Sequence, residues 1–429
     1  MSSTIAVEEL RVGMYIQLDG GWLSHPFPLS SFRIATAEQI ATLQGLGLAR
    51  VRWVPDKSEL AGAATAAPVG AAAAGDEAAA ATAPLLSPAD AQAAQRRVWL
   101  AAQRDAARLC ERQHAEAAQA WRGALDLVAA RPQEAGRTTE ALTRAMLEKM
   151  LGSDEIGIRL VAGGGDRAGG HALNVAVISL LIGRTLGLPD EAMQDLGVGA
   201  LMHDVGKIDL PDRFRHVEDG FSNAELGLYR DHVAKGVMHA QRMQLRAGAL
   251  AVLAQHHEHA DGSGFPLKLA GERIALASRI VAVVNRYDNL CNPGTRTLAL
   301  TPHEAVATMF AQGRTRWDAT VLSAFIRMMG VYPAGSLVQL TDDRYAMVVG
   351  VNSSRPLKPR VLVHEPHGRG QAVAAEAQLL DLEQAHDLGI RRSLAASKLP
   401  PAVLQALDPR PRVAYYFEPI ARECAPSAA

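Results

Sequence analysis

The sequence predicts a multidomain, mainly α-helical protein with a small α+β N-terminal domain, an all-helical central bundle and a small β-rich C-terminal subdomain. Three observations support this fold class. The 429 residues exceed one ordinary domain. Residues 59–86 are rich in Ala, Gly and Pro and almost without charge, which is typical of a flexible linker. Apolar residues then follow helical spacing as far as about residue 330, and β-rich segments come after it.

The N-terminal domain, residues 1–58, combines short strands with one helix. Alternating or clustered apolar residues predict strands at 4–7, 14–18 and 51–54. Thr36 followed by Gln39 is a capping-box pattern, and it predicts a helix that runs through Leu46. The aromatic residues of this domain are interpreted as core, and they are Trp22, Phe27 and Phe32.

Residues 87–152 are predicted to form two connecting helices. Ser87 and Pro88 have the residue types of an N-cap and a first helical position, and the pattern runs on to about Ala130. A second helix follows, from 138 to about 151. The pair is interpreted as signal-connecting or dimerising, and a dimerising pair would make the protein a homodimer. His114 is interpreted as a solvated surface residue and not as a ligand.

Residues 153–330 are predicted to be helical throughout, with helices at 171–186, 190–203 and 275–290 and two more between them. Ser222 and Glu225 form a capping box for the helix that carries His232. The next helix delivers His256 and His257. After Tyr332 the character changes, and strands are expected at 336–341, 345–352, 360–364 and 413–417, within a C-terminal subdomain of residues 331–429.

Bulk composition excludes several classes of function. The net charge of −1 gives no basic footprint for a nucleic-acid polymer or a membrane surface. Three widely spaced cysteines form no disulfide framework, which is typical of a reducing cytoplasm. The acidic N-terminus does not resemble a signal peptide, and the longest apolar run is far shorter than the ~20 residues of a membrane span. We expect a soluble, cytoplasmic protein.

Five histidines and one aspartate fall on successive predicted helices within about ninety residues. Imidazole and carboxylate groups together suit first-row divalent ions, and one carboxylate can bridge two of them. Two such ions can activate water at neutral pH and clamp a phosphate. The alternative is that each histidine is an isolated core or surface residue, which the adjacent pairs make less favourable. The candidate ligands are His171, His203, Asp204, His232, His256 and His257.

Three short motifs among these residues carry a family resemblance. They are His-Asp-Val-Gly-Lys at 203–207, His-His-Glu at 256–258 and Asp-Gly-Ser-Gly-Phe-Pro at 261–266. Together they resemble the HD-GYP family of cyclic di-GMP phosphodiesterases, over about 166–318. The first 55 residues resemble the domain of unknown function that often precedes HD-GYP in bacteria.

The resemblance implies an all-helical HD-type bundle that holds two divalent metal ions, iron or manganese. One ion would take His171, His203, Asp204 and a residue at position 285. The other would take the bridging Asp204 with His232, His256 and His257. Asp204 and Lys207 are the implied catalytic residues, and Lys207 would neutralise the phosphoryl oxygens as charge builds on them.

The sequence departs from the family pattern at several positions. Asn285 stands where the family has its last metal-binding aspartate, and its carbonyl oxygen brings no charge. Arg167 stands where three-metal members have a glutamate, so a third metal is not expected. Phe265 replaces the signature tyrosine in the loop motif Gly264, Phe265 and Pro266.

The residues expected to contact substrate also differ from the family. Gly294 and Thr297 occupy positions where phosphate-contacting basic residues are usual. Arg296 offers replacement charge, and Arg286 is a second candidate for it. The expected substrate-binding residues are therefore Lys207, Asp288 and Arg296.

The leading functional hypothesis is hydrolysis of cyclic di-GMP to pGpG, GMP or both, in bacterial second-messenger signalling. The alternative is a degenerate HD-GYP module that binds a nucleotide or a partner protein without turnover. A third hypothesis, an HD phosphohydrolase acting on a mononucleotide, is less favoured because of the Gly-Phe-Pro segment. The expected partners are cyclic di-GMP, and a diguanylate cyclase with a GGDEF domain or another signalling protein.

Overall fold

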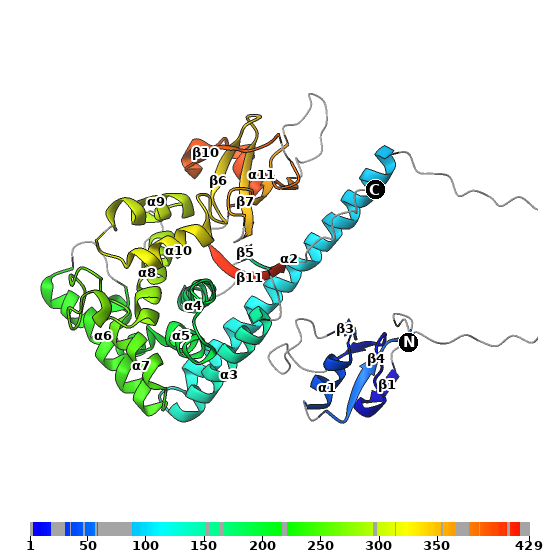
Figure 1. Ribbon diagram of the computed structural model, residues 1–429. Coiled ribbons are helices and arrows are strands. Elements are labelled where there is room, and N and C mark those ends of the chain that lie inside the picture. The colour runs from blue at the N-terminus through cyan, green and yellow to red at the C-terminus, as the bar shows by residue number, and fades with distance from the viewer. Residues whose placement is uncertain are drawn as a thin grey trace, which may run out of the picture. The chain divides into compact units, whose positions relative to one another are not determined.

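The chain divides into two units in the computed structural model, Met1–Asp105 and Ala106–Ala429, and each is described by itself. The elements are mainly helices, with a small N-terminal sheet and an antiparallel C-terminal sheet, which confirms the predicted fold class (Figure 1). The structure describes residues 3–18, 31–34, 36–45, 48–55, 58, 88–151, 155–162, 167–216, 221–294, 298–313, 315–352, 355–365, 377–385, 387–409 and 412–420.

The first unit is built on a four-stranded antiparallel sheet with the order β1-β4-β2-β3. Its strands are β1 (Ser3–Ala6), β2 (Tyr15–Gln17), β3 (Ser31–Arg33) and β4 (Arg50–Trp53). The predicted capping box opens α1 (Ala37–Gly45), with reciprocal hydrogen bonds between Thr36 and Gln39. Strand β3, which contains Phe32, was not predicted. Trp22, Phe27 and the predicted linker lie outside the described residues.

The two connecting helices are α2 (Pro88–Leu127) and α3 (Pro132–Leu151). The interpretation of His114 as a surface residue was wrong. Its side chain is buried, and its ring lies edge-on to Tyr416, with 6.1 Å between ring centroids. Burial lowers the pKa of His114 to about 4. The sequence pattern of α2 could not show this, because the covering Tyr416 comes from a strand about three hundred residues later.

The helices that carry the candidate ligands follow in chain order. They are α4 (Arg167–Thr185), α5 (Asp190–Met202), α6 (Asn223–Arg242), α7 (Ala247–Gln255), α8 (Leu276–Cys291), α9 (Pro302–Gln312) and α10 (Ala319–Met329). Helix α4 is apolar almost all round, and it packs on both α5 and α8. The predicted capping box at Ser222 and Glu225 opens α6. The C-terminal ends of α5 and α7 thereby lie near the first turns of α4 and the middle of α6.

The expectation of helix throughout 153–330 missed one strand. Residues Glu155–Val161 form β5, which pairs along its full length with β11 (Ala414–Ile420) and also with β7 (Tyr345–Asn352). The remaining strands of this seven-stranded sheet are β6 (Leu337–Leu340), β8 (Arg360–Val363), β9 (Gln378–Asp381) and β10 (Ile390–Leu394). Strands β9 and β10 and the short helix α11 (Pro401–Leu407) were not predicted. The C-terminal sheet thus includes β5, a strand that precedes helices α4 to α10 in the chain.

A buried ion cluster fixes β5 and β11 in the sheet. Arg159 of β5 donates to Glu418 of β11 at 2.7 Å, and Arg360 of β8 also pairs with Glu418. Burial alone would raise the pKa of Glu418, but the two guanidinium groups hold it below its usual value. Removing Glu418 would take away the carboxylate that both buried guanidinium groups share.

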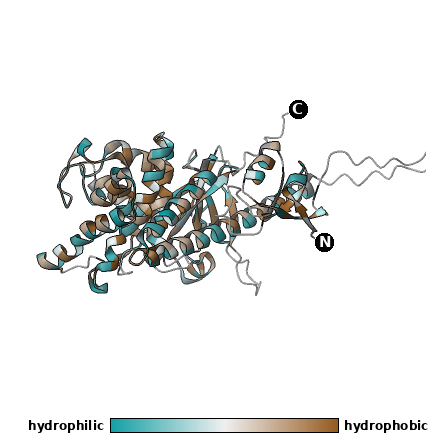
Figure 2. Cartoon of the chain, turned by 90° about the horizontal axis from the view of Figure 1, so that it is seen from below, coloured by the Kyte–Doolittle hydropathy of each residue, from teal (hydrophilic) through white to brown (hydrophobic). Residues whose placement is uncertain are grey.

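Within the described part of the chain, no helix combines the length and the apolar character that crossing a membrane requires. Hydrophilic residues are spread along the helices in Figure 2. Helix α4, the most apolar of the longer ones, is surrounded by its neighbours in the bundle.

Candidate metal centre

The six candidate ligands come together from four helices. His171 lies in α4, His203 caps the C-terminal end of α5 with Asp204 next to it, and His232 lies in α6. His256 caps α7 and His257 follows it. They form two groups that share one carboxylate, and within each group the ligand atoms lie within 4.8 Å of one another. The groups are His171, His203 and Asp204, and Asp204, His232, His256 and His257.

Three of the histidines are oriented by their own helices. His203, His232 and His256 each place Nδ1 against the backbone carbonyl three residues earlier, at 2.7, 2.5 and 2.9 Å. A carbonyl only accepts, so Nδ1 carries the proton and donates it. Each Nε2 is then left with a free lone pair that faces the centre of the cluster. This is the arrangement that metal-binding histidines adopt in proteins.

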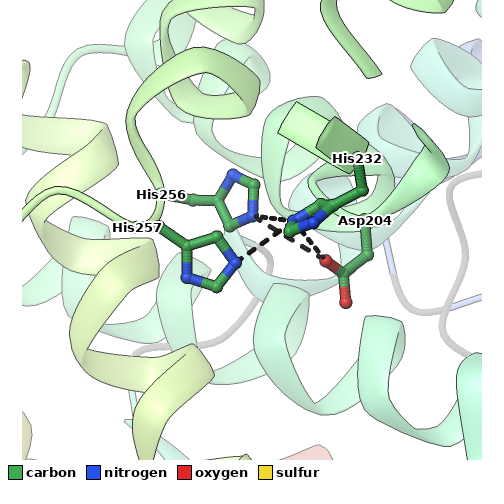
Figure 3. A group of neighbouring side chains, drawn as sticks. All are labelled: Asp204, His232, His256 and His257. Carbon is green, nitrogen blue, oxygen red and sulfur yellow. Dashed lines mark hydrogen bonds and ion pairs between the residues drawn. The ribbon is translucent and has the colours of Figure 1, made fainter. Parts of the chain in front are cut away.

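The group around His232 brings three ring nitrogens and one carboxylate oxygen close together. His232 Nε2 lies 3.3 Å from His256 Nε2 and 3.2 Å from His257 Nε2. Figure 3 shows these rings converging toward the carboxylate of Asp204, whose Oδ1 is 3.5 Å from His232 Nε2. That oxygen is buried and has no hydrogen-bond partner among the described residues. Lone pairs gathered in this way fit a divalent cation.

Electrostatics keep this group ready to bind a cation. Burial lowers the pKa of His232 to about 4 and holds the pKa of His257 well below its usual value. Both rings are therefore neutral at pH 7, which is the form that binds metal. Burial alone would raise the pKa of Asp204, but Lys207 and the surrounding histidines hold it well below its ordinary value.

The group around His171 differs because a protein cation already contacts it. Asp204 Oδ2 lies 3.5 Å from Nε2 of both His171 and His203, and Lys207 Nζ lies 2.6 Å from the same oxygen. Burial lowers the pKa of His171, but hydrogen bonds to Asp204 and Asp288 outweigh burial and raise it to about 9. His171 is thus protonated at pH 7 in the metal-free protein.

Asp288 was expected to contact substrate, and in the structure it lies behind His171. Its side chain is fully buried, and Oδ2 accepts from His171 Nδ1 at 2.6 Å. Its other oxygen accepts from Asn174 at 2.7 Å and from Asn292 at 2.9 Å. Asp288 therefore orients His171 from behind, because α8 turns this carboxylate toward α4 and away from the cavity. Arg296, which was also expected to contact substrate, lies outside the described residues.

Asn285 is buried one turn before Asp288 on α8. Its Oδ1 accepts a hydrogen bond from Asn289 Nδ2 at 2.6 Å, and the same amide also donates to the Asn285 carbonyl at 2.9 Å. The one uncharged oxygen that Asn285 offers is thus already hydrogen-bonded. The group around His171 has three well-placed ligands, His171, His203 and Asp204. None of these three comes from α8.

The segment after Asp204 is packed tightly on α6. A Cβ added to Gly206 would lie 2.0 Å from the carbonyl oxygen of His232 and 2.4 Å from the backbone nitrogen of Gly236. Only glycine allows this approach, which brings Asp204 and His232 into one site. Lys207 follows in the short 3-10 helix Val205–Asp209, which directs its ammonium group back to Asp204.

The Gly-Phe-Pro loop supports the second group of ligands. A Cβ on Gly264 would lie 2.5 Å from the backbone of residues 257–259, so the loop rests directly on that segment. Phe265 stacks on His257, with 4.4 Å between ring centroids, and its peptide bond to Pro266 is cis. Glu258 is buried and accepts from two backbone amides of the loop. The motif therefore fixes the His257 ring from the outside.

Sequence reasoning missed several residues of the site. Tyr229 lies under the second group, with its hydroxyl 3.4 Å from His257 Nε2 and Lys207 Nζ 5.3 Å from its ring centroid. Asn174 and Asn292 hold Asp288, and they stand three and four residues after His171 and Asp288. Helical spacing from a known ligand was the signal that could have identified them.

Comparison with known proteins agrees with this geometry. The profile of the HD domain matches residues 126–321, and that of a domain of unknown function (DUF3391) matches residues 2–138. A cyclic di-GMP phosphodiesterase of Pseudomonas aeruginosa is 30% identical over 376 residues, 85% of this chain and 85% of the relative. A 3'3'-cGAMP-specific phosphodiesterase of Vibrio cholerae is 31% identical over 124 residues, 28% of this chain and 24% of that protein.

Among solved structures, an HDG"Y"P protein from Bdellovibrio bacteriovorus matches with a TM-score of 0.41 and 14% identity, over 76% of this chain and 98% of that one. The match to the domain of unknown function continues past residue 58 through α2 into α3. The similarity to the Pseudomonas relative spans most of both chains. The chain belongs to the HD-GYP family of HD-domain phosphohydrolases and carries the domain DUF3391 at its N-terminus.

Proposed function

We propose that the protein is a metal-dependent phosphodiesterase that hydrolyses cyclic di-GMP to pGpG, GMP or both. The observation that carries the proposal is the shared carboxylate of Asp204, which joins two groups of ligands whose free nitrogens face inward. The relative from Pseudomonas aeruginosa, a cyclic di-GMP phosphodiesterase, supports the choice of substrate.

The residues present fit two divalent ions, with iron or manganese as the proposed metals. His232, His256 and His257 with Asp204 would hold one ion, and His171 and His203 with Asp204 would hold the other. When bound, such ions supply hydroxide at neutral pH and neutralise phosphoryl oxygens. Lys207 would add a positive charge at the edge of the His171 position, where charge develops on the phosphoryl group.

Turnover of three substrates by one preparation tests the reaction and the substrate class. Protein loaded with Fe²⁺ or Mn²⁺ is incubated with cyclic di-GMP, with 3'3'-cGAMP and with GMP, and the products are separated by chromatography. We expect pGpG or GMP from cyclic di-GMP at the highest kcat/KM. Faster hydrolysis of 3'3'-cGAMP, the substrate named for the Vibrio relative, would reassign the substrate. Release of phosphate from GMP alone would favour a mononucleotide phosphohydrolase.

A second candidate function is binding of the nucleotide without hydrolysis. Two observations favour it: the oxygen of Asn285 is already bonded to Asn289, and Lys207 occupies the Asp204 oxygen that faces His171. This alternative predicts one ion per chain and bound cyclic di-GMP without product. The variant Asn285→Asp distinguishes binding with hydrolysis from binding without it. A sharp gain of activity, together with a second bound ion, would show that the wild-type protein lacks activity because Asn285 replaces a carboxylate ligand. A protein partner such as a diguanylate cyclase, a homodimer and a cytoplasmic location stay predictions of the sequence.

A further inference from the structure

A cavity of about 210 Å³ opens beside the His171 group. Its lining includes the apolar side chains of Trp121 and Leu125 from α2. The lining also includes His171, Asp204 and Lys207, so a molecule in the cavity would lie next to the ligands of one metal position. A nucleotide held here needs a cation for its phosphate, and the cavity lining shows which cation is free to bind it.

Four basic side chains line the cavity: Arg167, Lys207, Arg215 and His216. Lys207 is paired with the carboxylate of Asp204. Arg215 donates from Nε to two backbone carbonyls, at 3.1 and 3.2 Å, and its Nη1 pairs with the acid three residues earlier at 2.8 Å. Burial and the charge of Arg167 lower the pKa of His216 to about 4, so this ring is neutral at pH 7. Three of the four are therefore paired or uncharged.

One N–H group of Arg167 has no hydrogen-bond acceptor among the described residues. Its Nε donates to the Asn292 carbonyl at 3.2 Å, but Nη1 is buried without a hydrogen-bond partner among the described residues. Burial lowers the pKa of this guanidinium, and Arg412 nearby lowers it further. Buried donors almost always find an acceptor, and a guanidinium beside another cation favours an anion. An anionic acceptor that enters the cavity would satisfy this N–H group.

The position of Arg167 suits an anion at the metal position. It stands one helical turn before His171 on α4, so both side chains extend from the same face of the helix. Its Nη1 lies 3.4 Å from the position a Cβ would take on Gly294, so the guanidinium fills the space over that glycine. A longer side chain at 294 would push the guanidinium out of this place.

We propose that Arg167 binds a phosphodiester group of the substrate in this cavity. The inference rests on the proposed phosphodiesterase function and names a binding residue for it. The planar guanidinium presents parallel N–H donors that match two phosphate oxygens, which an ammonium group cannot do. Arg167 holds the phosphodiester beside His171, and Lys207 stays on Asp204. The chain thereby supplies its phosphate-binding cation from the start of α4.

The test compares binding with turnover in Arg167→Met, Arg167→Lys and Gly294→Val. Equilibrium dialysis gives Kd for cyclic di-GMP on metal-free protein, which cannot consume it, and Kd for inorganic phosphate on Mn²⁺-loaded protein. Steady-state kinetics on Mn²⁺-loaded protein give KM and kcat. We expect Arg167→Met to raise Kd for both probes and KM for cyclic di-GMP by tenfold or more, with kcat changed less than threefold. Arg167→Lys should recover part of the loss. Gly294→Val should raise KM by displacing the guanidinium without removing it.

Arg213→Met is the matched control, because Arg213 is 69% exposed and pairs with Glu225 away from the cavity lining. It should keep KM, Kd and metal content within twofold. Unchanged Kd and KM in Arg167→Met would overturn the inference while the phosphodiesterase function stands. Loss of bound metal in Arg167→Met would also overturn it, since the residue would then support the ligands. Wild-type protein that binds cyclic di-GMP without hydrolysing it would refute only the phosphodiesterase function. The Kd values of wild type and Arg167→Met would then decide whether Arg167 binds the phosphodiester.

Discussion

Replacing Asp288 by asparagine tests how the metal position at His171 is held. Asp288 accepts three side-chain hydrogen bonds, from His171, Asn174 and Asn292. The substituted asparagine would have the same shape but would carry one amino group in place of an acceptor. In either orientation of the amide, a donor would face a donor, toward His171 on one side or toward the two neighbouring asparagines on the other.

The size of the effect follows from these contacts. One unsatisfied buried donor costs about 1–3 kcal/mol of folding stability. Loss of an outer carboxylate behind a metal-binding histidine typically weakens metal binding by about 10–100-fold, or roughly 1.4–2.7 kcal/mol. The group around His232 does not contain Asp288, so its affinity should change little.

Calorimetric titration of metal-free protein with Mn²⁺ measures both positions, and urea unfolding measures stability. Asp318→Asn is the control: it also removes a carboxylate that accepts hydrogen bonds, but at the N-cap of α10. We expect the control to lose stability without losing metal affinity. The reasoning about Asp288 is refuted if Asp288→Asn binds two ions with affinities within threefold of wild type.

Three further predictions concern other parts of the molecule. The pKa of His114 is lowered to about 4, so the unfolded chain takes up the proton first as the pH falls. Stability present above pH 6.5 should drop by about 3 kcal/mol on reaching pH 4, and His114→Leu should flatten this part of the pH profile of urea unfolding; an unchanged profile contradicts it. Gly206→Ala would push a Cβ into the His232 carbonyl, so both the Tm of the metal-free protein and Mn²⁺ affinity should fall, and unaltered values would show that α6 can yield. Because the pKa of His171 is raised to about 9, Mn²⁺ uptake at its position should release one proton and strengthen about tenfold per pH unit up to that pH. Mn²⁺ uptake at the His232 position should release fewer protons than uptake at the His171 position at pH 8, because the pKa values of His232 and His257 are lowered. Calorimetry in two buffers of different ionisation enthalpy measures the protons released, and equal release at both positions would contradict the prediction.

The local signals of the sequence located the elements well. The capping boxes at Thr36 and Ser222 open helices as predicted, because the first turn of a helix is fixed by residues three apart. The adjacency of His203 with Asp204 and of His256 with His257 also indicated a cluster. Each pair lies at the C-terminal end of a helix, and that information is local.

Several of the differences come from contacts between distant segments. His114 is covered by Tyr416, and β5 is a strand because it pairs with β11 at the other end of the chain. Asp288 faces His171 because α8 packs on α4. Periodicity along one segment carries no information about which segment will cover it. The free N–H of Arg167 could be found only in the folded chain.

The measurement that tests the central claim most directly compares wild type with Asp204→Asn. Metal content per chain and the rate of cyclic di-GMP hydrolysis are measured on the same Mn²⁺-loaded preparations. Because Asp204 is the carboxylate common to both ligand groups, we predict that wild type hydrolyses the dinucleotide and that Asp204→Asn loses bound metal and activity together. Full metal content with undiminished hydrolysis in Asp204→Asn would contradict the account.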